Sequence, residues 1–99
     1  MSRYRMAIPI NAEMRQAILA KFDVDIKGGS VQMAWGLDND GYFLQLWTDD
    51  DNGELYLEDG FMGTSKNRII ELLEKYNILE FVRDCEPEKF QNLCLDLPL

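Results

Sequence analysis

The sequence contains no histidine, so the side chain that most often acts as a general base or metal ligand near neutral pH is missing. Its two cysteines, Cys85 and Cys94, form no C-x-x-C pair. No Gly-rich phosphate-binding loop and no nucleophile motif accompany its carboxylates. These absences argue against an enzyme, a metal site and a bound cofactor. We expect both cysteines to be reduced thiols, with Cys94 buried between leucines.

Long apolar runs are missing as well. No stretch approaches the ~18 apolar residues of a membrane span, and the basic N-terminal region lacks the apolar segment of a secretion signal. We therefore expect a soluble, cytoplasmic protein that does not bind membranes. The chain of 99 residues, 46% of them hydrophobic, is long enough for one hydrophobic core. This predicts a single domain over residues 1–99.

Positive charge is absent from the middle of the chain. Residues 28–65 contain no lysine or arginine and eight of the 18 acidic residues. The other ten acids balance the ten bases, so this segment carries the whole formal net charge of −8. Such a field repels the phosphates of nucleic acids and attracts basic protein surfaces. We therefore expect no direct nucleic-acid binding, and a basic partner protein instead.

The same segment has the pattern of an antiparallel sheet. "VQMAWGL" alternates between large apolar and small or polar residues, "YFLQLWT" is apolar on both faces, and "ELYLE" alternates again. The turn sequences "DNDG" and "DDDNG" between them end in Asp-Gly and Asn-Gly, which tolerate the positive φ of tight hairpins. Together they predict a three-stranded meander over residues 31–58. "YRMAIPI" predicts a further strand, with Pro9 at an edge or a strand end.

Two segments have helical periodicity, about 11–22 and about 65–76. Asn11 is suited to cap the first, and Thr64 or Ser65 the second. We therefore predict an α+β fold in which a three- or four-stranded antiparallel sheet carries two main helices on one face. The expected core consists of Ile18, Phe22, Met33, Trp35, Leu44, Leu46, Leu57, Ile69, Leu72 and Leu73, and Ala17 and Leu19 widen the stripe of the first helix.

The C-terminal end of the chain permits two structures. Pro87 suits the first position of a short last helix, because its missing N–H is not needed there. The alternation of Leu93, Leu95 and Leu97 is equally compatible with a final strand. Periodicity alone does not decide between them.

The aspartate run resembles a calcium-binding loop only in part. In a twelve-residue EF-hand window over 48–59, Asp50, Asn52 and Gly53 match the loop. Thr48 stands where the first carboxylate ligand is required, and the flanks have strand periodicity instead of helical periodicity. A hairpin turn explains Asn52 and Gly53 without an ion, so we predict no metal site.

One face of the predicted sheet is the candidate functional surface. If the leucines of the meander face the helices, then Phe43, Gln45, Trp47 and Tyr56 share the opposite face, fringed by the acids of the turns. Aromatic anchors and surrounding charges are typical of protein interfaces. A covered second core layer under the C-terminal segment is the alternative. The candidate partner-binding residues are Asp38, Asp40, Phe43, Gln45, Trp47, Asp49, Asp50, Asp51, Glu54, Tyr56 and Glu58.

These features predict a non-enzymatic acidic protein-protein interaction module that occupies a basic, nucleic-acid-binding site on a partner protein. An inhibitor or DNA mimic of the phage or plasmid type fits that description. A small regulatory or ligand-sensing domain is a second interpretation, and it requires a pocket between sheet and helices lined by Trp35, Phe22 and Tyr76. A structural subunit that forms a homodimer through a self-complementary apolar patch is the third.

Overall fold

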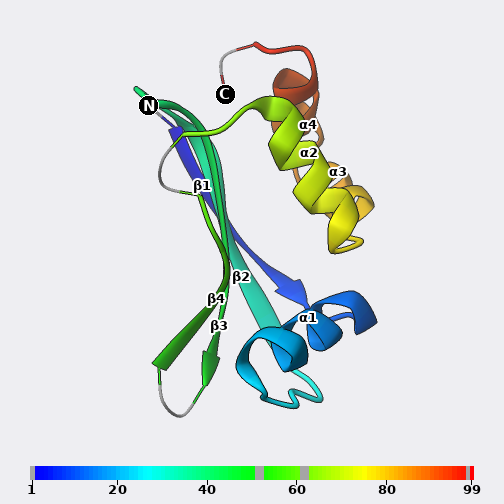
Figure 1. Ribbon diagram of the computed structural model, residues 1–99. Helices are drawn as coiled ribbons and strands as arrows, with labels where there is room; N and C mark the ends of the chain where they lie inside the picture. The colour runs from blue at the N-terminus through cyan, green and yellow to red at the C-terminus, as the bar shows by residue number, and fades with distance from the viewer. Residues whose placement is uncertain (1, 51–52, 61–62, 98) are drawn as a thin grey trace.

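The computed structural model describes residues 2–50, 53–60, 63–97 and 99. Four antiparallel strands form one sheet in the order β1-β2-β3-β4, and the helices all lie on one of its faces (Figure 1). This confirms the predicted α+β architecture, with four strands. The elements are β1 (Ser2–Pro9), α1 (Ala12–Phe22), β2 (Ser30–Asp38), β3 (Gly41–Asp50), β4 (Gly53–Asp59), α2 (Lys66–Lys75), α3 (Leu79–Cys85) and α4 (Pro87–Cys94). In the described ranges, no helix is long and apolar enough to cross a membrane.

Both predicted helix caps form. The Asn11 side-chain oxygen accepts a hydrogen bond from the Met14 N–H at 2.9 Å, and its amide nitrogen donates to the Tyr76 carbonyl at 2.8 Å. One side chain therefore starts α1 and ties it to the end of α2. Ser65, one of the two candidates, caps α2 by accepting from the Arg68 N–H at 3.2 Å.

A single hydrophobic core lies between the sheet and the helices, and every element contributes a buried residue to it. Nine of the ten predicted core residues are buried, and Phe22 packs half-buried at the margin. Leu19 is 46% exposed, so the prediction that it widens the stripe of α1 is wrong. The buried residues of α1 are Met14 and Ile18, a narrow line along one side of this short helix, and Leu19 lies beside that line in solvent.

The C-terminal end is helical, and the alternative of a final strand is wrong. Pro87 is the first residue of α4, as predicted, and Leu93 is buried inside this helix. Beyond α4 the chain turns through a left-handed residue, Asp96 (φ 59°), which leaves Leu95 and Leu97 58% and 46% exposed. Cys94 is exposed, so the predicted burial between leucines is also wrong: its neighbour Leu93 uses the inward side of α4.

Two glycines shape the β2–β3 turn and the chain that returns to β3. The turn Asn39-Asp40 has negative φ, and the positive φ falls on Gly41 (125°) alone, while Asp38 accepts a side-chain hydrogen bond from the Asp40 N–H at 2.9 Å. Gly60 lies against β3 and donates its N–H to the Leu44 carbonyl at 2.9 Å. A Cβ at position 60 would lie 2.6 Å from that carbonyl oxygen, so only glycine fits there.

Candidate functional site

A bulge in β4 changes which side chains share the helix-free face. Trp47 pairs with Tyr56, whereas Leu46 pairs with Glu58, so Leu57 is an extra residue. From Glu58 onward the alternation of β4 is therefore reversed.

The reversal places Glu58 on the helix side, where it accepts a hydrogen bond from the Tyr76 hydroxyl at 2.7 Å and forms an ion pair with Lys75 at 3.5 Å. The predicted placement of Glu58 beside Tyr56 on the partner-binding face is thus incorrect. Asp59 lies on the helix-free face in its place, where it accepts a hydrogen bond from Gln45 at 3.0 Å.

Three rows of paired residues cross the helix-free face. They are Arg3–Gly36–Phe43, Arg5–Ala34–Gln45–Asp59 and Ala7–Gln32–Trp47–Tyr56. The alternative that the C-terminal segment covers this face is wrong, because α4 packs on the other side of the sheet (Figure 1). Its Lys89 lies 3.8 Å from the ring centroid of Tyr4, which pairs with Trp35 on the helix side.

Two arginines of β1 cover the aromatic residues of β3. The Arg3 guanidinium lies 5.8 Å from the Phe43 ring centroid, and that of Arg5 lies 5.3 Å from the Trp47 ring centroid. Strand β2 lies between them and places the small residues Gly36 and Ala34 directly opposite Arg3 and Arg5, so the arginine stems pass over it. Cation–π attraction holds the guanidinium groups in place.

The predicted exposed aromatic anchors are therefore mostly covered. Phe43 is 5% exposed and Trp47 is 6% exposed. Tyr56 stays partly exposed and stacks on Trp47 with ring centroids 5.7 Å apart. The sheet thus has a thin second apolar layer, but its lid consists of N-terminal arginine side chains and not of the C-terminal segment.

Gln45 connects the charges of this face. It is 2% exposed, accepts a hydrogen bond from Arg3 Nη2 at 3.2 Å and donates from Nε2 to Asp59 at 3.0 Å. A buried amide whose oxygen and nitrogen both form hydrogen bonds is rigid. Gln45 therefore fixes the orientation of the Arg3 guanidinium.

The acids predicted to fringe the aromatic patch lie at the two ends of the sheet. Asp38 and Asp40 belong to the β2–β3 turn, and Asp49, Asp50 and Glu54 flank the β3–β4 turn. Strand β3 has ten residues, so the two groups are about 30 Å apart. Asp51 lies outside the described residues.

None of these five acids forms an ion pair with a described residue, whereas five other acids do, namely Asp25, Glu58, Glu71, Asp84 and Glu86. Glu54 instead accepts a hydrogen bond from the Tyr56 hydroxyl at 2.7 Å, and this bond raises the pKa of Tyr56 above its ordinary value. Both ends of the sheet therefore carry negative charge that no base of the described residues neutralises in an ion pair.

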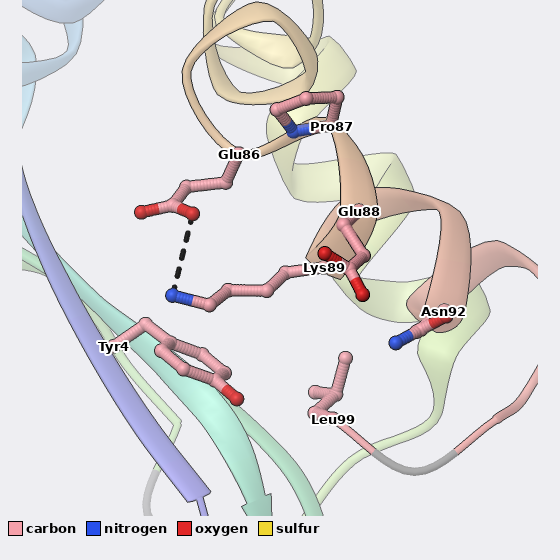
Figure 2. A pocket seen from close by; sticks show the side chains of 7 residues that line it. All are labelled: Tyr4, Glu86, Pro87, Glu88, Lys89, Asn92 and Leu99. Atoms are coloured by element: carbon pink, nitrogen blue, oxygen red, sulfur yellow. Dashed lines mark ion pairs between the residues drawn. The ribbon is translucent and has the colours of Figure 1, made fainter.

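The described hollows on the surface are open and shallow. The one in Figure 2, about 390 Å³, lies between the start of α4 and β1, where Lys89 reaches over the Tyr4 ring and pairs with Glu86 at 3.3 Å. The Lys89 ammonium in this hollow is therefore already paired with Glu86 and with the Tyr4 ring.

None of the hollows described for this structure is the pocket of Trp35, Phe22 and Tyr76 that the second interpretation requires. Trp35 and Tyr76 are 1% and 3% exposed, and the hollow of about 550 Å³ that Tyr76 lines includes neither of the other two. Residues 2–50, 53–60, 63–97 and 99 contain no group of three side chains that could hold a metal ion.

Comparison with known proteins finds no family model, no curated protein and no solved structure that matches the chain.

Proposed function

We propose that the protein is a non-enzymatic binding module whose acidic β3–β4 hairpin end enters a basic site on a partner protein. The observation that carries the proposal is the uncompensated charge of Asp49, Asp50 and Glu54. The nearby base Lys21 is engaged elsewhere, because its ammonium donates to the carbonyls of Tyr56 at 2.8 Å and Leu57 at 3.3 Å. Lys21 therefore caps backbone carbonyls at the outer edge of β4, and it forms no ion pair with the described acids of the hairpin end.

The shape of the hairpin supports this choice. Figure 1 shows the β3–β4 end diverging from β1, while α1 contacts β4 at Tyr56 and Leu57 through Lys21, so the end of the two strands beyond these residues projects from the sheet. A projecting acidic end fits a concave basic site, and exposed charges of one sign accelerate association with a surface of the opposite sign. Asp38 and Asp40, about 30 Å away along β3, contribute to the same contact only if the partner is wide.

A strict imitation of a DNA duplex is the weaker form of the proposal. Duplex DNA presents phosphates in an unbroken series, with one negative charge per ~1.7 Å of axis. On the helix-free face, Arg3 and Arg5 stand between the two acidic ends and interrupt the negative charge. A nucleic-acid-binding protein still qualifies as the basic partner, through contact with the hairpin end alone.

The test compares two variants of equal net charge. The hairpin variant carries Asp49→Asn, Asp50→Asn and Glu54→Gln at the hairpin end. The helix variant carries Glu13→Gln, Glu74→Gln and Glu80→Gln at exposed helix positions. Each variant loses three acidic charges, which changes the formal net charge from −8 to −5. We expect a partner captured by the wild-type protein to associate at least about tenfold more slowly with the hairpin variant at low salt. The helix variant should retain most of the rate. Equal rates for both variants would show that only overall charge matters, and the proposed site would be abandoned.

A further inference from the structure

Neither of the two arginines on the helix-free face forms an ion pair with a carboxylate of the described residues. Five other basic side chains, Arg15, Arg68, Lys75, Arg83 and Lys89, are each in an ion pair. Arg3 and Arg5 are exposed, and neither forms an ion pair with a described residue. In a chain of net charge −8, two arginines without such an ion pair on one open face are a specific feature of this surface.

The arginine pair is also held in place before any ligand arrives. The rings of Phe43 and Trp47 lie beneath the two guanidinium groups, and Gln45 accepts a hydrogen bond from Arg3. Arg3 and Arg5 are two residues apart on β1, which places their Cα atoms about 7 Å apart on the same face. Arginine side chains fixed in this way lose less conformational entropy when they bind.

We propose that Arg3 and Arg5 form a docking site for two carboxylates, spaced two residues apart, in an extended segment of a partner protein. The planar guanidinium fork matches a carboxylate in a bidentate arrangement, and alternate residues of an extended chain have the same Cα spacing of about 7 Å as Arg3 and Arg5. The site is separate from the acidic hairpin end, and it does not depend on the function proposed for that end.

The surrounding charge selects an acidic peptide and not a nucleic acid. Asp59 and Glu54 stand on β4, the opposite edge strand of the sheet, and the whole chain is negative, so a polyphosphate that crosses this face meets repulsion beyond the arginine pair. A peptide segment with two carboxylates among neutral or basic residues is repelled only at those two carboxylates, which are the groups that the arginines bind. The partner segment that fits is therefore locally acidic at two alternating positions.

The first test uses a short synthetic peptide, acetyl-Gly-Glu-Ser-Glu-Gly-amide, titrated into the intact protein while NMR follows the arginine Nε–H and Trp47 indole resonances. We expect it to bind at least about tenfold more tightly than the same peptide with glutamine in place of glutamate, because charge-assisted hydrogen bonds are lost in the latter. Inorganic phosphate and pentathymidylate serve as comparison anions. Equal binding of the two peptides, or tighter binding of pentathymidylate, would overturn the proposal.

Variants separate a binding role from a covering role. Arg3→Lys with Arg5→Lys keeps the stems and the charge but removes the planar forks, so we expect the preference for the glutamate peptide to fall severalfold. Arg15→Lys with Arg83→Lys on exposed helix positions should not change it. A lysine variant that retains the full preference would mean that the arginines only cover the rings. Removing the acids of the hairpin end should leave peptide binding equal or stronger, which distinguishes this site from the one proposed above.

Discussion

The two faces of the sheet are covered by different parts of the chain, and this difference decides how each could be predicted. On the helix side, Leu44 and Leu46 of β3 meet the apolar stripe of α2, which begins only a few residues after β4. On the other face, Phe43 and Trp47 are covered by Arg3 and Arg5 from the opposite end of the chain. The apolar residues of β3 indicate that both of its faces are covered, but they contain no information about what lies over each face. One cover is apolar and thick, and the other is a single layer of charged side chains.

The largest expected difference between the faces appears when a helix-side residue of β3 is truncated. Leu46 has no exposed surface, so Leu46→Ala should lower the free energy of unfolding by about 3 kcal/mol through lost burial and a residual cavity. Leu19→Ala, at a leucine that is 46% exposed, should change it by less than about 0.5 kcal/mol. Urea denaturation at neutral pH measures both values. A small effect for Leu46 would mean that the core between sheet and helices is loosely packed.

A smaller loss is expected when the cover of the helix-free face is removed. Arg5→Ala should cost about 1 kcal/mol, because it removes the cation–π contact and uncovers Trp47. Arg5→Met keeps an apolar stem over the ring and should fall between the alanine variant and the wild type. Acrylamide quenching of tryptophan fluorescence should increase in the same order, since Trp35 stays buried in every variant. Unchanged quenching in the alanine variant would mean that other side chains shield Trp47.

The helices and strands follow from local sequence patterns, which do not depend on what covers each face of the sheet. The alternation in residues 31–58 and the caps at Asn11 and Ser65 are properties of short segments, and each has the predicted structure. Helix α3 also has a local signal, since the buried residues Ile78 and Val82 are four apart in the sequence. Local signals of this kind do not require knowledge of the tertiary structure.

The composition of the candidate surface depends on contacts between distant segments. The bulge at Leu57 arises from the register between β3 and β4, and it alone moves Glu58 to the helix side and Asp59 to the other face. The arginine cover requires small residues at Gly36 and Ala34 together with the β1–β2 pairing. The charge of residues 28–65, summed along the sequence, therefore missed the two cations that the fold adds to the same surface.

The tyrosine–carboxylate contacts of the helix side predict a sensitivity to high pH. The hydrogen bond from the Tyr42 hydroxyl to Asp96, at 2.6 Å, raises the pKa of Tyr42 to about 12. Because the native state keeps the proton longer than the unfolded chain, this stabilisation is complete below pH 10 and is lost as the pH rises toward 12. Tyr42→Phe should weaken the decline of stability over that range, and it should cost about 1 kcal/mol at neutral pH. Urea denaturation at several alkaline pH values measures the slope, and an identical slope in the variant would contradict this origin.

The smallest effect on stability is expected at the β3–β4 hairpin end, whose acids belong neither to the helix-side core nor to the arginine layer on the other face. Asp49 and Glu54 are exposed, and Asp49, Asp50 and Glu54 form no ion pair with a described residue. Their replacement by Asn, Asn and Gln should therefore change the free energy of unfolding by no more than about 0.5 kcal/mol. The change should be a gain at low salt, since like charges are removed, and it should vanish at about 1 M salt, where the Debye length is near 3 Å.

The triple variant Glu13→Gln, Glu74→Gln and Glu80→Gln provides the control for net charge in this measurement. Those acids are spread over three helices, and Glu13 and Glu80 stand in first turns where a negative charge is favourable, so their removal should slightly destabilise the protein. If the free energy of unfolding at low salt rises in the hairpin variant and falls in the helix variant, the acids of the hairpin end repel one another in the folded protein. A large loss of stability in the hairpin variant would instead assign the acids a structural role, and their availability to a basic partner would no longer follow from their lack of ion pairs with described residues.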